Sequence, residues 1–172
     1  IFRNFPRGST YTPQARYFSA AIIVAEGLTA FADDDPMVGT QKYQQAISSL
    51  SEVLTLPVST TEHREVMDLT HLAIGRLQYE LGEIPAAIAE YTAVAPDSPF
   101  YDDALYELIW ANIEAASQET VDFVRERKLQ EAMRAVEIFN LAFPGDVRES
   151  KLRLLAAQVQ QKMEQWESAI DE

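Results

Sequence analysis

Residues 71–99 read HLAIGRLQYELGEIPAAIAEYTAVAPDSP, and small and aromatic residues recur in them at helical spacing. Tyr91 follows Ala87 by one helical turn, and Pro99 lies eight residues further on. Gly82 separates two apolar stretches, which is typical of a turn between helices, and a proline beyond the second stretch ends it. The segment therefore predicts a hairpin of two helices.

The second half of this pattern recurs along the chain, and so does the first. Second helices match at Ala132, Val136 and Pro144, at Ala46, Leu50 and Pro57, and in a copy cut off after Trp166 and Ala169. First helices match at Ala15 and Tyr17, Thr70 and Leu72, and Ala104 and Tyr106. Internal repeats of roughly 20 to 50 residues indicate stacked supersecondary units, here about three and a half of them.

Helix boundaries support the same division. Capping side chains precede prolines at Thr12-Pro13, Asp35-Pro36 and Ser98-Pro99, and capping-box spacing occurs at Ser59 with Glu62 and Asp146 with Glu149. We expect helices over 13–31, 36–55, 61–81, 84–95, 99–116, 118–142 and 147–163, and an eighth from about 166. With only six glycines and with prolines between the apolar segments, the fold class is all-α.

Two units are longer than the others. Ala132 lies 45 positions after Ala87, 11 more than a 34-residue repeat allows, so residues are added around 117–127. The first unit is lengthened around 31–40. Because an added stretch has no neighbour at its tip, these two hairpins should project beyond the second and leave a notched surface.

Composition limits the classes of partner. The 172 residues are 47% hydrophobic and 24% charged, which suits a folded domain with a sizeable core. The formal charge of −13 repels phosphate backbones and anionic membranes, so we expect no nucleic acid and a basic or mixed-charge partner. No apolar run approaches the roughly 18 residues that span a bilayer, the longest being 20–25, so direct membrane insertion is not expected.

Other features leave the compartment open. Cysteine is absent, which fits either a reducing or an oxidising compartment. The chain begins at Ile1 rather than Met and ends within a repeat pattern. We therefore interpret it as a piece of a longer protein.

Residues 70–103 resemble a tetratricopeptide repeat, and the chain from about 13 to 171 resembles a tandem array of that family. Residues 95–110 are similar to repeats in bacterial cell-envelope members, including those of outer-membrane assembly and gliding machinery. His71 and Gln78 depart from the usual Trp and Tyr of the motif. The resemblance implies a right-handed α-solenoid with units at about 13–58, 59–98, 99–145 and a truncated 146–172, after an extended segment 1–12.

Members of this family bind peptides or folded partners, many on the concave face formed by first helices. Carried over by position, the expected partner-binding groove contains Tyr17, Leu72, Arg76, Tyr79, Tyr106, Trp110 and Ile113, with Phe18, Ala21, Glu80, Glu107 and Glu114 beside them. Aromatic residues and arginine concentrate binding energy at interfaces. For Tyr106 and Trp110, which lie one turn apart, a packing stripe against the next hairpin is an equal alternative.

No arrangement of residues indicates catalysis, a metal or a cofactor. His63 and His71 share a helix face without a carboxylate at zinc spacing, so packing or surface roles are favoured, with His71 inside its hairpin. Residues 33–35 lack the glycine and distal glutamate of a calcium loop and suit helix capping. The isolated glycines form no phosphate loop.

The sequence thus predicts a protein–protein interaction scaffold and not an enzyme. The alternative is a structural spacer that self-associates through its ends, because Trp166, Ala169 and Ile170 begin an apolar helix without a partner. The compartment stays open, with a lean towards a bacterial periplasm or envelope from the resemblance alone.

Overall fold

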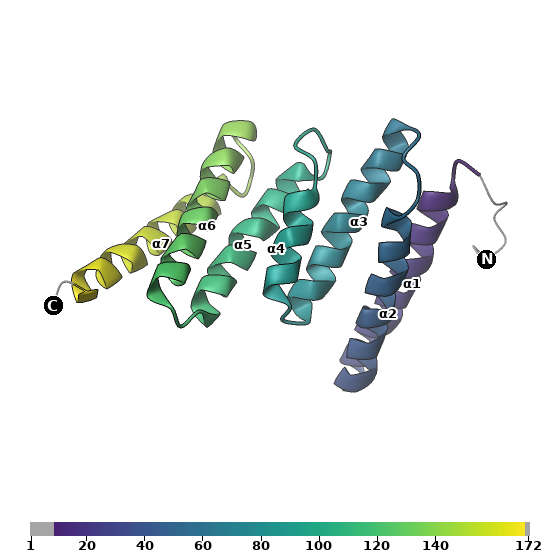
Figure 1. Cartoon of the computed structure of the whole chain (residues 1–172), viewed down its shortest axis with the longest axis horizontal. Helices are drawn as coiled ribbons and strands as arrows, with labels where there is room; N and C mark the ends of the chain where they lie inside the picture. Colours follow the sequence, from purple (N-terminus) through teal and green to yellow (C-terminus); the bar gives the residue numbers. More distant parts are fainter. Residues whose placement is uncertain (1–8, 171–172) are drawn as a thin grey trace.

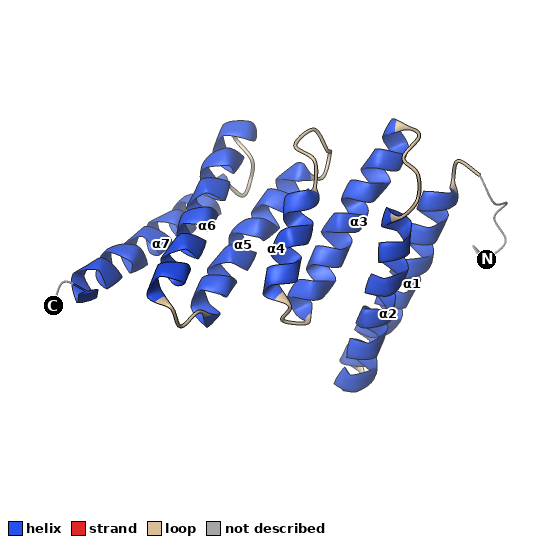
Figure 2. Cartoon of the chain, viewed as in Figure 1, coloured by secondary structure: helices blue, strands red, loops and turns tan. Residues whose placement is uncertain are grey.

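Residues 9–170 fold into seven α-helices. The computed structural model describes the backbone of residues 9–170 and the side chains of residues 9–161 and 163, and no strand occurs in this part (Figures 1 and 2). The helices are α1 (Thr12–Ala32), α2 (Pro36–Leu54), α3 (Thr61–Glu80), α4 (Ile84–Ala93), α5 (Tyr101–Gln118), α6 (Asp122–Ala142) and α7 (Glu149–Ile170). The predicted all-α class is confirmed. Most of the expected extended segment, residues 1–8, lies outside the described residues.

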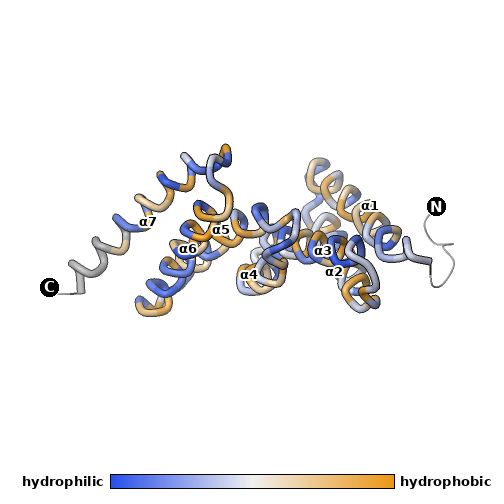
Figure 3. The backbone as a smooth tube through the Cα atoms, turned by 90° about the horizontal axis from the view of Figure 1, so that it is seen from above, coloured by the Kyte–Doolittle hydropathy of each residue, from blue (hydrophilic) through white to orange (hydrophobic). Residues whose placement is uncertain are grey.

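Each helix packs on the next, and the closest pairs are α1 with α2, α3 with α4 and α5 with α6. Contacts also join α1 to α3 and α3 to α5. Seen from above, α1, α3, α5 and α7 lie along one side of the row, and α2, α4 and α6 lie along the other (Figure 3). The hairpins therefore stack side by side with their first helices on a common face.

The core forms in segments between neighbouring hairpins. One cluster joins α1, α2 and α3 around Leu50 and Ile74, the next joins α3, α4 and α5 around Leu72 and Tyr91, and a third joins α5, α6 and α7 around Phe139. Because no cluster spans the whole row, each hairpin buries its apolar face only against its neighbours. The surfaces left over run along the row.

Some of the predicted helix caps are present in the structure, and others are not. Asp35 accepts a hydrogen bond from the backbone N–H of Val38 (3.2 Å), as expected for the first residue before α2. The cap of α3 is Thr60, not Ser59, and its hydroxyl accepts from the N–H of His63 (3.2 Å). Ser98 does not cap α5, because Pro99 and Phe100 still belong to the turn and the helix begins at Tyr101.

The lengthening of two units falls in their second helices. α2 and α6 have 19 and 21 residues, whereas α4 has 10. The α1–α2 hairpin projects beyond α3–α4 in Figure 1, as predicted, but the α5–α6 hairpin does not project comparably.

The last element differs from the expectation. α7 continues without a break from Glu149 to Ile170, so no eighth helix starts near 166. Residues 160–170 contain neither proline nor glycine, and nothing in them stops a helix. The side chains of Trp166, Ala169 and Ile170 lie outside the described residues.

Helix α1 is longer and more apolar than expected from the sequence, in which no continuous apolar run approached the length that spans a bilayer. Its 21 residues, with a mean hydropathy of 1.2 over their most apolar window, are long and apolar enough to cross a membrane, although core helices and signal sequences pass the same test. Polar residues such as Gln14, Arg16 and Ser19 interrupt the run, which is why no continuous stretch stands out. Here α1 packs on α2 and α3. The absence of membrane insertion stays a prediction.

Candidate functional site

A pocket of about 240 Å³ opens between α1 and α3, and we call it the α1–α3 pocket. It is lined by Tyr17, Ala21, Val24, Leu50, Leu69, Ala73, Arg76 and Leu77. Burial raises the pKa of Tyr17, partly opposed by the positive charge of Arg76, so the phenol keeps its proton at neutral pH. The pocket thus combines apolar walls with one hydroxyl and one guanidinium, which suits an amphipathic ligand.

Two exposed apolar side chains of α1 directly follow residues that line this pocket, Tyr17 and Ala21. Phe18 and Ile22 are 54% and 52% exposed and lie one turn apart. They are on the side of α1 away from α2, because Gly27, roughly opposite on the helix, is so close to α2 that a β-carbon there would lie 2.8 Å from Cδ1 of Tyr43. We call Phe18 and Ile22 the α1 stripe, and Figure 3 shows hydrophobic colour along much of this helix.

Arg76 connects α3 to α5 at the centre of the row. Its Nε donates to Oε1 of Glu107 (2.8 Å) and its Nη2 to Oδ2 of Asp103 (3.2 Å). Burial lowers the pKa of Arg76, but the two carboxylates outweigh it and raise the pKa above the usual value. The residue is 46% exposed, so it both lines the α1–α3 pocket and holds the two helices together.

The structure separates the predicted groove residues into three environments. Tyr17 and Arg76 meet at the α1–α3 pocket. Tyr79 is partly buried against the cluster that joins α3, α4 and α5, which we call the α3–α5 cluster. Leu72 is a correction, because it is only 1% exposed and packs in that same cluster with residues of α4 and α5. It therefore presents no surface to a partner.

Tyr106 and Trp110 face α7, with Ile113 beyond them. Their rings meet edge to face at 6.4 Å, and Nζ of Lys151 lies 5.6 Å and 5.5 Å from the two ring centroids. All three residues are partly buried against the cluster that joins α5, α6 and α7 around Phe139, which we call the α5–α7 cluster. The packing alternative therefore describes them better than an open groove.

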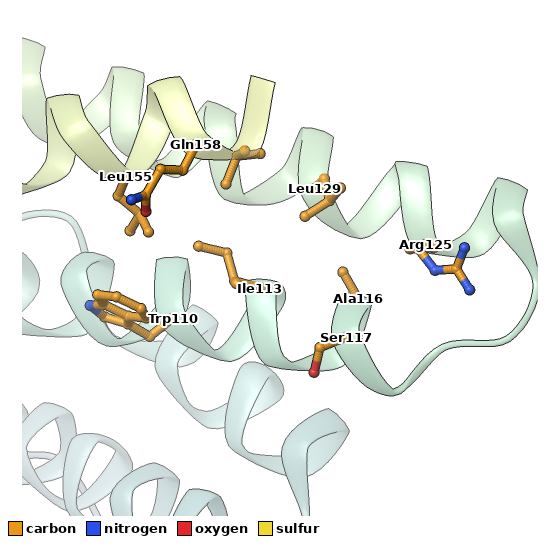
Figure 4. Close-up of a pocket in the computed structure, with 9 residues that line it drawn as sticks. Trp110, Ile113, Ala116, Ser117, Arg125, Leu129, Leu155 and Gln158 are labelled. Atoms are coloured by element: carbon orange, nitrogen blue, oxygen red, sulfur yellow. The ribbon is translucent and has the colours of Figure 1, made fainter. Parts of the chain in front are cut away.

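Trp110 and Ile113 also border an opening that we call the α7 wedge. It measures about 620 Å³ and is lined by Trp110, Ile113, Ala116, Ser117, Arg125, Leu129, Leu155, Gln158 and Val159. Figure 4 shows Leu155 of α7 and Ile113 of α5 pointing toward one another across it. The wedge exists because α7 diverges from α6 along its length (Figure 1).

Arg148 fixes the start of α7, and sequence reasoning missed it. Its guanidinium donates to Asp102 (2.5 Å), Asp103 (2.8 Å) and Asp146 (2.9 Å). Its Cζ lies 5.5 Å from the ring centroid of Tyr106 and 5.0 Å from that of Phe139. One side chain therefore joins α5, α6 and the turn before α7. A signal was present, since Arg148 follows Asp103 by 45 positions, the same step that separates Ala87 from Ala132.

This cluster predicts a measurable dependence of stability on pH. Hydrogen bonds from the side chain and backbone of Arg148 lower the pKa of Asp146 from 3.8 to about 2. The folded state thus keeps this carboxylate charged to a lower pH than the unfolded chain does, so the stabilisation is complete above about pH 4 and is lost as the pH falls through about 2. In urea titrations at pH 4, 3 and 2, we expect Asp146→Asn to show a shallower fall in unfolding free energy than the parent chain.

The control for this prediction is Glu137→Gln on the exposed surface of α6. This variant should show the same fall in unfolding free energy from pH 4 to pH 2 as the parent chain. Identical slopes for the parent chain and Asp146→Asn would show that Asp146 does not carry the effect.

The two histidines have structural partners. Nε2 of His63 donates to the carbonyl of Thr10 (2.6 Å), and its Nδ1 lies 3.0 Å from the hydroxyl of Ser59. Nδ1 of His71 lies 2.7 Å from Oε2 of Glu90 and joins α3 to α4 inside the hairpin. Within the described residues, no group of three or more His, Cys, Asp or Glu could hold a metal ion.

Comparisons with known proteins do not place the chain in a family. No family model matches it, and a search of curated proteins found no match. Its class is therefore inferred from repeat spacing, the order of its helices and the surfaces described above.

Proposed function

We propose that the chain is a protein-binding scaffold made of tetratricopeptide-like hairpins, arranged as a right-handed α-solenoid and acting within a larger assembly. The observation that carries this proposal is the α1 stripe, two exposed apolar side chains on the helix that forms one wall of the α1–α3 pocket. Contiguous exposed apolar surface beside polar groups is typical of a protein interaction site. The proposed partner is a protein or peptide, and the proposed activity is binding without catalysis or a cofactor.

The α1 stripe is also the best place for a test. Replacing Arg76 or Tyr106 would remove ion pairs or ring contacts within the chain. Phe18 and Ile22 are exposed, so a change there should leave the fold intact. Loss of binding after such a change would therefore report on contact with a partner.

We expect site-specific photo-crosslinking in the native host to find a partner at the α1 stripe. With p-benzoylphenylalanine in place of Phe18, ultraviolet light should give a discrete adduct on a denaturing gel. The matched control carries the same group in place of Leu141, which is 84% exposed on α6. An adduct from position 141 alone, or from neither position, would contradict binding at this face.

A second candidate function is a spacer that self-associates. The observations in its favour are the α7 wedge, an apolar opening, and Leu154 of the same helix α7, which is 62% exposed. Sedimentation velocity over a hundredfold range of concentration separates the two functions. A mass that rises with concentration supports the spacer, whereas a constant mass supports the scaffold.

A further inference from the structure

Two carboxylates, Glu80 on α3 and Glu114 on α5, lie beyond the hydrogen bond that joins Arg76 to Glu107. Arg76 and Glu107 are bonded to one another, which places their helix faces at the same level. Glu80 follows Arg76 by one turn of α3, and Glu114 follows Glu107 by two turns of α5, so both extend the same faces toward the C-terminal ends of these helices. In the described part of the chain neither forms an ion pair with lysine or arginine, although the amide of Gln118 donates to Glu114 (2.9 Å).

Tyr79 reports the electrostatic effect of these carboxylates. Burial raises its pKa, and the negative charges of Glu114, Glu80 and Glu107 raise it further. The side chain therefore lies in a region of negative potential. A cation placed there would be attracted by the carboxylates and by the face of the tyrosine ring.

The apolar and the acidic features lie on neighbouring helices. Phe18 and Ile22 of the α1 stripe directly follow Tyr17 and Ala21, which line the α1–α3 pocket. Arg76 of α3 lines the other side of the pocket, one turn before Glu80. An occupant of this surface needs an apolar face toward α1 and positive charge toward α3 and α5. The net charge of −13 favours the approach of such an occupant over an acidic one.

We infer that this surface binds an amphipathic helix of a partner protein, with its apolar face on Phe18 and Ile22 and a lysine or arginine beside Glu80 and Glu114. The inference rests on the proposed scaffold function and specifies the chemistry of the partner. A helix laid along α1 buries the two apolar side chains at their one-turn spacing. Its basic side chain pairs with the two carboxylates, which form no ion pair with lysine or arginine among the described residues.

The test uses the whole chain and two synthetic helical peptides of 18 residues. One contains leucine, alanine and lysine, and in the other every lysine is replaced by glutamate. We expect fluorescence anisotropy to show that the lysine peptide binds. The glutamate peptide should bind with an affinity at least about 100-fold lower. The double variant Glu80→Gln/Glu114→Gln should weaken the lysine peptide about tenfold, and so should Phe18→Ser/Ile22→Ser.

A charge-matched variant distinguishes a specific surface from general attraction. Asp33→Asn/Glu137→Gln removes two negative charges from exposed positions at the C-terminal end of α1, 11 residues beyond Ile22, and on α6. It should change the affinity less than about threefold, because exposed charges beyond a Debye length are largely screened. Circular dichroism checks that all three variants stay folded.

Two results would overturn the inference. In the first, Glu80→Gln/Glu114→Gln and Asp33→Asn/Glu137→Gln weaken binding of the lysine peptide equally. In the second, the lysine and glutamate peptides bind with equal affinity. If either occurs while a crosslink still forms from position 18 in the host, the scaffold function stands and only the partner chemistry is wrong. If the crosslink also fails, the scaffold function fails with it.

Discussion

Arg148→Met should lower the free energy of unfolding by about 2–3 kcal/mol, the cost typical of leaving partly buried charges without their partner. The arginine is 21% exposed and donates four hydrogen bonds to Asp102, Asp103 and Asp146. Methionine keeps most of the apolar stem against Tyr106 but brings no charge. Three carboxylates would then repel one another between α5 and α7. Urea denaturation at pH 7 followed by circular dichroism measures the change.

Two further variants make this prediction specific. Arg153→Met removes an arginine in the first turns of α7 that is 73% exposed and pairs with Glu149, so it should change stability by no more than about 0.5 kcal/mol. Arg148→Lys should fall between the two, because an ammonium group keeps the charge but cannot reproduce the planar fork. Equal effects of Arg148→Met and Arg153→Met would show that the cluster does not hold α7 in place.

The same cluster shows which part of the site a single sequence could supply. Repeat spacing placed the first helices on one face, and with them Tyr17 and Arg76. It could not show that Asp103 is shared by Arg76 and Arg148, because that depends on how three helices approach one another. Helical periodicity identifies the face a residue occupies, and tertiary packing decides what covers that face.

Leu72 and Trp110 illustrate this limit. Leu72 lies one turn before Arg76, yet it is 1% exposed while Arg76 is 46% exposed, since the α3–α5 cluster encloses only the former. Trp110 is covered from α7, whose Lys151 lies over its ring. Both positions carry a residue type suited to either role, so the sequence leaves the choice open.

The starts of helices were easier to predict than the surroundings of a side chain, because capping residues and prolines within a few positions determine where a helix begins. Asp35 caps α2 through its own side chain, and Pro36 at the first position fixes the start. The failures also have local causes. Ser98 and Pro99 form a turn whose cap residue is Phe100, and α7 continues past 163 because no breaking residue follows.

Gly75→Ala should destabilise the chain by about 2 kcal/mol, although alanine is the better helix former by up to about 1 kcal/mol. A β-carbon at position 75 would lie 2.5 Å from Cε1 and 2.7 Å from Cδ1 of Tyr91. That ring is 2% exposed, and its hydroxyl donates to Glu107 (3.3 Å), so it cannot withdraw. Either α4 moves away from α3 or the ring leaves its rotamer, and overpacking of this kind outweighs the gain in helix propensity.

Gly39→Ala provides the matched comparison that decides whether crowding is the cause. A β-carbon there would lie 2.7 Å from the ring of Phe31, but that ring is 38% exposed near the end of α1 and can turn into solvent. Gly39→Ala should therefore be neutral or slightly stabilising in the same urea titration. Adding Tyr91→Leu should reduce the cost of Gly75→Ala by about 1 kcal/mol, because the coupling between two residues in contact is then removed. An unchanged cost in that background would mean that the glycine is needed for its backbone and not for the space it leaves to Tyr91.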